Sequence, residues 1–285
     1  MSRLKPRQKP AGRRQTKQKP QPSKTPLKSF QKEMEYALKV VKASERITLK
    51  YFRSRFKVDY KTDKSPVTIA DKSCEKFLVK ELSRKFPDHG FYGEEFGSSG
   101  AELPRSQTRW IIDPIDGTRN FTRGIPYWGT LCGLEHDGQI VAGIMALPAL
   151  KETYYASRGH GAFRNGKRIR VSKLRDLEKS TVVFGGLNFF LGSKYEEGFE
   201  EIIKSAYHDR GFGDCFGYTF VANGSAEAML DPIVSPWDVA AIKIIIEEAG
   251  GIFTDFEGDS TIYSKTGIAA NPYIHEAILR KLSRL

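Results

Sequence analysis

The chain is predicted to fold as an α+β protein with two lobes, because its hydrophobic pattern changes character along the sequence. After residue 29, apolar residues recur at helical spacing, and short apolar and polar units then alternate from residue 127 to residue 156. From residue 173 onward, strand-like and helix-like segments alternate. We therefore divide the 285 residues into a tail (1–29), an N-terminal α+β half (30–172) and a C-terminal α/β half (173–285).

The composition argues against several classes of protein. Three cysteines are an odd number without metal-type spacing, so neither a disulfide framework nor a zinc site is expected. The longest apolar run, from about Ile140 to Leu150, is too short to span a bilayer and contains a glycine and a proline. The amino terminus also lacks the apolar core of a secretory signal. We therefore expect a cytoplasmic protein without a membrane span.

The net charge of +12 is concentrated in the first residues of the chain. Residues 1–28 contain ten Lys or Arg and no acid, which leaves a net charge of +2 for the remainder. This tail has almost no large apolar groups and cannot bury enough surface to offset the entropy of ordering, so it is predicted to be disordered. It is either an arm that binds RNA, membrane lipid or a partner, or a solvated extension without catalytic consequence.

Two helices are predicted at the start of the folded part. From Phe30, apolar residues recur at helical spacing as far as Phe52, which is typical of an amphipathic helix packed on a core. A second helix is marked by apolar residues between Phe77 and Phe86, and Asp71 lies at its start. Aspartate at a helix start is usually an N-terminal cap, so this residue alone favours a structural role.

The middle of the chain predicts an antiparallel sheet. Three short units alternate apolar and polar residues, over residues 127–135, 139–147 and 152–156. The dipeptides Asp137-Gly138 and Asn165-Gly166 have the chemistry of tight hairpin turns. Strands joined by such turns pair antiparallel with their neighbours in sequence.

The C-terminal half predicts strands that alternate with helices. A strand at T-V-V-F-G-G is followed by predicted helices over residues 194–207 and near residues 217–223. A further helix has Ser235 as its candidate N-cap, a proline at its first position and Gly250-Gly251 as its end. Asn271-Pro272 is expected to open the terminal helix.

The most informative candidate site residues lie in the stretch W-I-I-D-P-I-D-G-T, residues 110–118. The run W-I-I is typical of a strand that enters a core, and it is expected to stop at Asp113-Pro114. A tight turn there aims Asp113 and Asp116 at one point, where two repelling anions favour a hard cation such as Mg²⁺. Gly117-Thr118 then opens a helix whose free N–H groups suit a phosphate. The alternative is an ordinary strand followed by a surface turn.

Further carboxylates match this motif elsewhere in the chain. Gly93-Glu94-Glu95 lies upstream, Pro236-Trp237-Asp238 lies downstream, and the block E-E-A-G-G follows it. In these four blocks and their order, the chain resembles the inositol monophosphatase superfamily of metal-dependent phosphatases, from about Phe30 to the C-terminus. The resemblance implies a layered α/β/α/β/α sandwich of the inositol monophosphatase and fructose-1,6-bisphosphatase type, with the active site between two halves. It also implies a homodimer that acts on a phosphate monoester.

The same resemblance implies two or three Mg²⁺ ions at the site. The implied metal ligands are Glu94, Asp113, the carbonyl of Ile115, Asp116 and Asp238. Asp113 bridges two of the ions, whereas Glu95 is either a ligand of a weak third metal or a solvated acid. Asp238 also has a structural explanation, because it falls in the first turn of its helix, where the helix dipole favours an anion.

The implied catalytic residues are Asp71, Thr118 and Glu94. Asp71 and Thr118 would act together to orient the attacking water. The backbone N–H groups of Gly117 and Thr118 would bind phosphate oxygens. Arg119 departs from the threonine common at this position in inositol phosphatases, and it either helps to hold phosphate or faces solvent.

Substrate selectivity is expected to depend on the C-terminal half. Inositol-selective members tend to carry a glutamate ahead of W-D and no acid in the earlier turn, whereas this chain has Asp231 and Asp214. The strings G-D-C-F-G-Y and D-P-I-V-S-P-W-D instead resemble the histidinol-phosphate phosphatase branch. A carboxylate pair would attract the ammonium of histidinol phosphate, which inositol lacks. The implied substrate-binding residues are Gly117, Thr118, Arg119, Asp214, Asp231 and Asp238.

Three alternatives accompany this interpretation. Asp214 has a structural explanation as the cap of the helix that follows it. The enzyme alternative is an inositol monophosphatase or a broad sugar phosphatase. The third alternative is an RNA-associated protein that uses the basic tail, and the complete set of metal ligands argues against an inactive enzyme.

Overall fold

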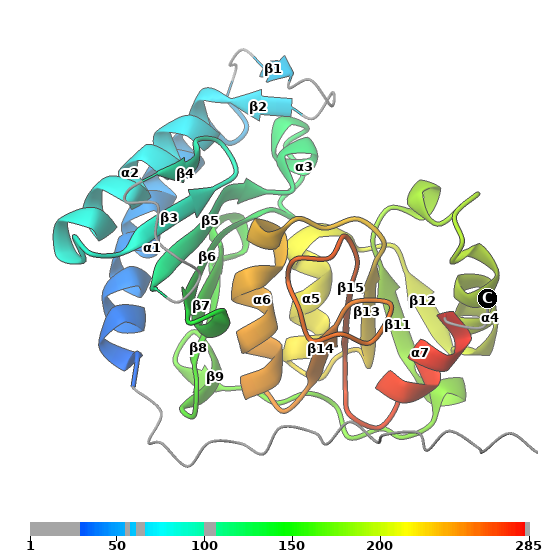
Figure 1. Ribbon diagram of the computed structural model, residues 1–285. Helices are drawn as coiled ribbons and strands as arrows, with labels where there is room; N and C mark the ends of the chain where they lie inside the picture. The colour runs from blue at the N-terminus through cyan, green and yellow to red at the C-terminus, as the bar shows by residue number, and fades with distance from the viewer. Residues whose placement is uncertain (1–28, 55–57, 61–65, 100–106, 283–285) are drawn as a thin grey trace, which may run out of the picture.

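The computed structural model describes residues 29–54, 58–60, 66–99 and 107–282, so residues 1–28 of the tail, which the sequence predicts to be disordered, lie outside the described residues. The described chain forms five layers (Figure 1). Helices α1 (Gln31–Tyr51) and α2 (Ile69–Lys85) cover the outer face of an eight-stranded sheet. Helices α5 (Asp214–Ala222) and α6 (Pro236–Glu248) lie between this sheet and a five-stranded sheet, whose far face carries α4 (Glu196–Ser205) and α7 (His275–Leu282). The predicted α/β/α/β/α sandwich is therefore confirmed.

The eight-stranded sheet belongs to the N-terminal half. Its strands are β3 (Gly90–Gly93), β4 (Gly97–Ser99), β5 (Arg109–Asp116), β6 (Gly129–His136), β7 (Gln139–Leu147), β8 (Glu152–Ser157), β9 (Gly161–Arg164) and β10 (Lys167–Arg168). Their order is β10-β9-β8-β7-β6-β5-β3-β4, and all neighbours pair antiparallel except β3 and β5, which pair parallel. Strands β1 (Val58–Tyr60) and β2 (Pro66–Thr68) form a separate antiparallel pair.

Both predicted hairpin turns are present. Asp137-Gly138 joins β6 to β7, and Asn165-Gly166 joins β9 to β10. All four residues have positive φ, between 48° and 82°. Two central residues with positive φ match the right-handed twist of the strands that they join, which is why Asp-Gly and Asn-Gly are favoured there.

The five-stranded sheet belongs to the C-terminal half. Its strands are β11 (Thr181–Phe184), β12 (His208–Arg210), β13 (Ala228–Asp231), β14 (Ile252–Thr254) and β15 (Gly267–Ala270), in the order β12-β11-β13-β15-β14. Strand β11 pairs parallel with β12 and β13, whereas β15 runs antiparallel to β13 and β14. Short 3₁₀ turns, η1 (Pro148–Leu150), η2 (Leu177–Lys179) and η3 (Leu187–Phe189), lie in the connections.

Helix α6 lies unusually close to the eight-stranded sheet. Gly133 of β6 and Gly143 of β7 pair with each other and face this helix. A Cβ atom on Gly143 would fall 2.5 Å from the carbonyl oxygen of Ala241, and one on Gly133 would fall 2.8 Å from the Cβ of Ala240. Only glycine leaves room for this approach. The two glycines thus allow α6 to lie close to the sheet, and this position brings the first turn of α6 near the end of β5.

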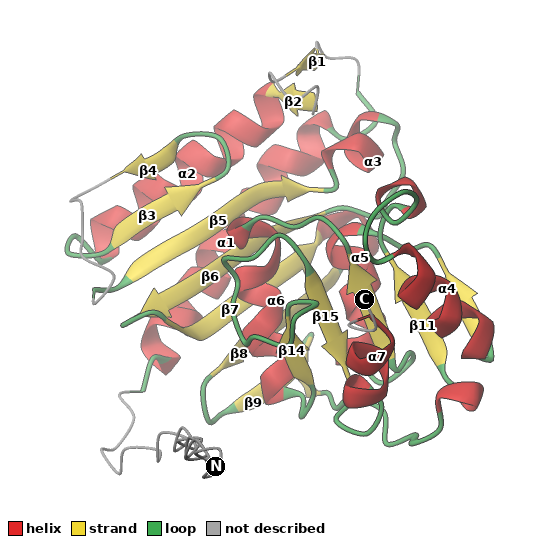
Figure 2. Cartoon of the chain, turned by 45° about the vertical axis from the view of Figure 1, so that its right-hand side comes forward, coloured by secondary structure: helices red, strands yellow, loops and turns green. Residues whose placement is uncertain are grey.

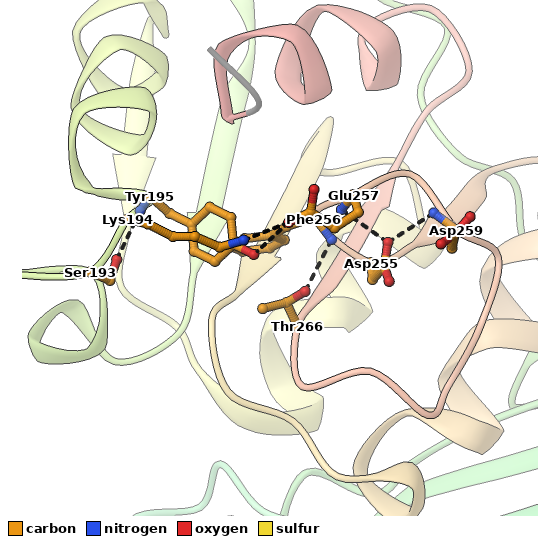
Figure 3. Close-up of polar contacts among 8 residues, drawn as sticks. All are labelled: Ser193, Lys194, Tyr195, Asp255, Phe256, Glu257, Asp259 and Thr266. Atoms are coloured by element: carbon orange, nitrogen blue, oxygen red, sulfur yellow. Dashed lines mark hydrogen bonds and ion pairs between the residues drawn. The ribbon is translucent and has the colours of Figure 1, made fainter. Parts of the chain in front are cut away.

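The beginning of α4 is tied to the turn after β14 by a polar network (Figure 3). Lys194 and Tyr195 both donate hydrogen bonds to Glu257, at 2.8 and 3.0 Å. In the same turn, the buried carboxylate of Asp255 accepts hydrogen bonds from the backbone N–H groups of Glu257 and Asp259. The network fixes the outer edge of the C-terminal half, away from the carboxylates described below.

The terminal helix starts later than the sequence predicts. Asn271 does not open α7 directly, because its side-chain oxygen accepts hydrogen bonds from the N–H groups of Tyr273 and Ile274 and thereby forms a turn. The helix begins at His275. No helix in the described part of the chain is long and apolar enough to cross a membrane.

Candidate active site

The end of β5 is a bulge and not the turn that the sequence predicts. Asp113 pairs with Leu131, but Asp116 pairs with Gly129, so β5 has one extra residue between its two aspartates. The strand continues through Pro114, which is tolerated because the ladder is already interrupted at the bulge. The extra residue bends the strand and aims both carboxylates toward one side. Beyond Asp116, the chain enters the short helix α3 (Thr118–Thr122) (Figure 2).

Three carboxylates meet at this end of β5. Asp113 and Asp116 come from the bulge, and Asp238 comes from the first turn of α6. One carboxylate oxygen from each residue lies within 4.8 Å of the others. The side chains of Asp113 and Asp116 are buried, with exposed fractions of 2% and 8%. The cluster of acids predicted to hold metal, hereafter the metal cluster, thus combines two residues of β5 with one residue of α6 that lies more than one hundred positions later in the sequence.

Each of the three carboxylates also holds the local backbone in place. Asp113 accepts a hydrogen bond from the N–H of Ile115 at 2.9 Å, and Asp116 accepts one from the N–H of Cys215 at 2.5 Å. Asp238 accepts one from the N–H of Ser235 at 2.7 Å, which is the capping arrangement expected for an acid in the first helical turn. One oxygen of each side chain is therefore fixed by the fold.

The cluster concentrates negative charge in a buried place. Burial is the first cause that raises the pKa of Asp113 well above its ordinary value, and the charges of Glu94, Asp116 and Asp238 raise it further. Burial likewise raises the pKa of Asp116 well above its ordinary value and that of Asp238 to about 7. Among the described residues, no Lys, Arg or His forms an ion pair with these three acids.

These observations fit the predicted metal. Three converging carboxylate oxygens without a cationic side chain are the donor set of a hard divalent ion, and Mg²⁺ prefers oxygen ligands. Glu94 follows β3, and its N–H donates a hydrogen bond to the carbonyl of Ile112, which places it beside the cluster. The predicted carbonyl ligand, that of Ile115, accepts a hydrogen bond from the hydroxyl of Thr118 at 2.9 Å.

The two residues expected to orient water are not hydrogen-bonded to each other in the described chain. The hydroxyl of Thr118 donates to Ile115, as stated above. Asp71 completes a capping box at the start of α2, where one carboxylate oxygen accepts from the N–H of Thr68 at 2.8 Å and from its hydroxyl at 2.5 Å. Its other oxygen is buried and has no partner in the described chain. The structural role that the sequence allowed for Asp71 is therefore present, and one oxygen is left over for a second role.

Asp214 is held against the turn between β5 and α3. Asn120 of α3 donates a hydrogen bond to Asp214 at 2.9 Å. Gly117 has a φ of +80°, and a Cβ atom there would fall 3.1 Å from the Asp214 carboxylate. Burial raises the pKa of Asp214 to about 6, and the nearby charge of the exposed Arg119 lowers it. Instead of capping α5, the carboxylate contacts α3 of the other half.

Asp231 lies at the end of β13 and faces the same space. A cavity of about 110 Å³ is shared by the metal cluster and the C-terminal half, and its lining includes Asp116, Asp214, Asp231, Asp238 and Tyr218. Burial, and then the charges of Asp214 and Asp238, raise the pKa of Asp231 well above its ordinary value. The buried hydroxyl of Tyr218 has no hydrogen-bond partner among the described residues. The lining of this cavity is therefore rich in buried carboxylates and includes one hydroxyl without a partner among the described residues.

A larger recess of about 560 Å³ adjoins this cavity along Gly185, Gly186, Phe189, Gly213 and Asp214. The sequence interpretation did not identify it. Its aromatic lining consists of Tyr127, Phe184, Phe189, Phe212 and Phe216. The rings of Tyr127 and Phe216 stack with centroids 4.1 Å apart and planes inclined by 5°. The sequence does not distinguish these residues from core aromatics, because they come from both halves of the chain and converge only in the fold.

Comparison with known proteins identifies the family. A model of the inositol monophosphatase family matches residues 30–285. The histidinol-phosphatase of Chlorobaculum parvum is 41% identical, over 84% of this chain and 91% of the relative, and that of Mycobacterium tuberculosis is 34% identical, over 85% and 94%. The extragenic suppressor protein SuhB of Bartonella henselae is a solved structure with a TM-score of 0.82 and 32% identity, covering 89% of this chain and 99% of that one. The chain therefore belongs to the inositol monophosphatase family and is a phosphoric monoester hydrolase.

Proposed function

We propose that this phosphatase uses Mg²⁺ to hydrolyse L-histidinol phosphate to L-histidinol and phosphate, as a step of histidine biosynthesis. The observation that carries the proposal is the position of Asp214 and Asp231, whose carboxylates line one cavity with the metal cluster. The names of the two relatives given above support the same substrate.

The reaction requires charge neutralisation at phosphorus and an activated water. In this proposal Glu94, Asp113, Ile115, Asp116 and Asp238 hold two or three Mg²⁺ ions. When bound, the ions supply a nucleophile at neutral pH and stabilise the charge of the transferring group. The N–H groups of Gly117 and Thr118 bind phosphate oxygens. Asp71, whose second oxygen is buried without a partner in the described chain, positions the attacking water together with Thr118.

The leaving group of histidinol phosphate carries an ammonium. Asp214 and Asp231 offer carboxylates beside the cavity, and the closeness of Asp214 helps to raise the pKa of Asp231. A cationic amine relieves that repulsion, whereas the neutral hydroxyls of inositol do not. The unpartnered hydroxyl of Tyr218 is available to a polar group of the same ligand. The electrostatics of this cavity therefore favour an amino alcohol ester over a sugar ester.

The leaving group also carries a flat imidazole ring. The aromatic recess beyond Asp214 offers stacked rings, and flat ligands gain most from offset or edge contacts with such rings. A polyhydroxylated cyclohexane presents no π face to them. The recess thus supports the same substrate through a contact that is independent of the carboxylates.

Three further parts of the proposal extend beyond the catalytic site. We infer that the enzyme acts in the cytoplasm as a homodimer, as the family resemblance implies. The basic tail is proposed to take no part in catalysis, and it is the only part of the chain proposed as a candidate for binding nucleic acid. Truncation of residues 1–28 tests this point, because it should leave the turnover of the folded part unchanged.

A substrate panel tests the proposed function. Phosphate release is measured with histidinol phosphate, inositol monophosphate, fructose bisphosphate and adenosine bisphosphate, first with Mg²⁺ and then after chelation. We expect histidinol phosphate to give the highest kcat/KM and chelation to abolish all activity. An enzyme that prefers inositol monophosphate would support the alternative function, an inositol or broad sugar phosphatase.

A further inference from the structure

Glu75 is a buried acid on α2, one helical turn after Asp71, and its side chain is only 1% exposed. Its carboxylate accepts two backbone hydrogen bonds from the turn that joins β3 to β4. The N–H of Glu95 donates to one oxygen at 2.9 Å, and the N–H of Phe96 donates to the other at 3.1 Å. No cationic side chain forms an ion pair with Glu75 in the part of the chain that the structure describes.

The turn held by Glu75 is the one that carries Glu94. The N–H of Glu94 donates to the carbonyl of Ile112 in β5, and the next two N–H groups donate to Glu75. Three consecutive peptide groups are therefore fixed, one by the strand that ends in the metal cluster and two by α2. The carboxylate also packs against Gly93, where a Cβ atom would fall 2.0 Å from its oxygen. No residue other than glycine fits at this position, because a Cβ atom there would overlap the Glu75 carboxylate.

We propose that Glu75 is a positioning residue that holds Glu94 in place for Mg²⁺ binding. The inference rests on the proposed metal site, since it assigns Glu75 no contact with substrate or with the reacting atoms. Residues that orient metal ligands through hydrogen bonds commonly change metal affinity by about 10- to 100-fold when they are altered. The side chain of Glu75 extends from α2 to the β3–β4 turn. It therefore links the helix that contains Asp71 to the turn that contains Glu94.

Two backbone N–H donors, one to each oxygen, require a carboxylate. Glutamine has only one acceptor oxygen. Its NH₂ group would therefore face the second backbone N–H, and neither of these two donors can accept a hydrogen bond from the other. Aspartate keeps both oxygens, but its side chain is one methylene shorter, so the oxygens lie farther from the turn. Both substitutions preserve most of the side-chain volume in a buried place, and both should release the turn without removing any metal ligand.

The experiment compares Glu75→Gln with Glu81→Gln, which makes the same change on the same helix at a position outside this contact. The Mg²⁺ concentration for half-maximal rate is measured together with kcat at saturating Mg²⁺. Mg²⁺ binding is measured independently of activity, by calorimetry and by the rise in Tm that Mg²⁺ produces. We expect Glu75→Gln to raise the required Mg²⁺ concentration about 10- to 100-fold, with kcat at saturation close to native. The Mg²⁺-induced rise in Tm should shrink in parallel, and Glu81→Gln should match the native protein.

A merely structural role predicts a different result. In that case the Tm of the metal-free variant falls, but the Mg²⁺ requirement of the folded enzyme and its Mg²⁺ affinity stay native, and this outcome would overturn the proposal. If Glu75→Gln does not fold, Glu75→Asp is measured in the same way with the same expected direction. A protein that binds Mg²⁺ but hydrolyses no ester of the panel would contradict the proposed function, while the calorimetry would still test Glu75.

Discussion

Asn120 donates a hydrogen bond to Asp214 across 2.9 Å, and this bond joins the two halves of the chain beside the metal cluster. The same amide group donates to the carbonyl of Tyr127, also at 2.9 Å. Asp214 in turn has a positive φ of 55°, a conformation that is uncommon for residues other than glycine, although aspartate adopts it more often than most. An unusual backbone at the first residue of α5 is thus stabilised by a side chain from α3, which places an acid against the expected phosphate turn.

Asn120→Asp is expected to destabilise the protein. The substitution removes both donated hydrogen bonds and places a second carboxylate beside Asp214, so the free energy of unfolding should fall by about 1–3 kcal/mol. Urea denaturation measures the change. Asn188→Asp is the control, because it makes the same charge change at an exposed position. Equal stability of the two variants would show that the bond between the halves contributes nothing measurable.

Asp113→Asn is expected to abolish activity while the fold stays intact. The amide keeps the volume of the carboxylate but removes the charge of the ligand proposed to bridge two metals. Loss of metal catalysis costs several kcal/mol, so the rate should fall to less than about a tenth of the native value. Circular dichroism checks the fold, and phosphate release measures the rate. A variant that keeps more than this fraction would show that Asp113 does not have the proposed role.

Asp71 and Thr118 are expected to act as one unit in catalysis. They are not hydrogen-bonded to each other in the described chain, so their proposed cooperation passes through the water that both orient. The kcat of Asp71→Asn, Thr118→Ala and the double variant is measured at saturating Mg²⁺. The double variant should be scarcely slower than the slower single variant. Multiplicative losses would mean that the two residues act independently.

The stability of the metal-free protein is expected to fall as pH rises. Burial raises the pKa of Asp71 to about 6 and that of Asp238 to about 7, so the folded state binds protons more tightly than the unfolded state does. Their contribution to stability is complete below the pKa of the unfolded carboxyl, about 4, and is lost as pH rises to about 7. Tm is measured across this range with a chelator and with Mg²⁺.

The pH dependence has an internal control. Asp238→Asn should reduce the fall in Tm, because the amide does not titrate, and saturating Mg²⁺ should reduce it as well by favouring the ionised carboxylates. A metal-free Tm with the same pH dependence in the native protein and in Asp238→Asn would contradict the assignment of the raised pKa to this residue.

The metal cluster could be predicted from the sequence because each acid stands at a recognisable boundary. Asp113 and Asp116 follow an apolar strand, and Asp238 follows a serine and a proline that open a helix. The bulge in β5 could not be predicted, because it depends on the register with β6. The late start of α7 was missed for a local reason, since the side chain of Asn271 forms a turn before the helix.

Other parts of the site depend on contacts between distant residues. Glu75 stands among the buried positions of α2, next to Cys74 and one turn before Leu78, and an acid on an apolar helical face was the signal that could have identified it. Its partners are backbone groups about twenty residues away, which no residue type reveals. The aromatic recess likewise combines Tyr127 with Phe216 from the other half, and either residue alone is typical of a core.

The ratio of kcat/KM for histidinol phosphate to that for inositol monophosphate tests the central claim most directly. It is measured in the native protein and in Asp231→Asn and Asp214→Asn. We predict a native ratio far above one that each substitution lowers by an amount equivalent to roughly 2–5 kcal/mol, the cost of losing one partner of a buried charge pair. The rate with inositol monophosphate should change little, because other residues hold the phosphate and the metals. A native ratio below one, or a ratio that stays constant in both variants, would contradict the account.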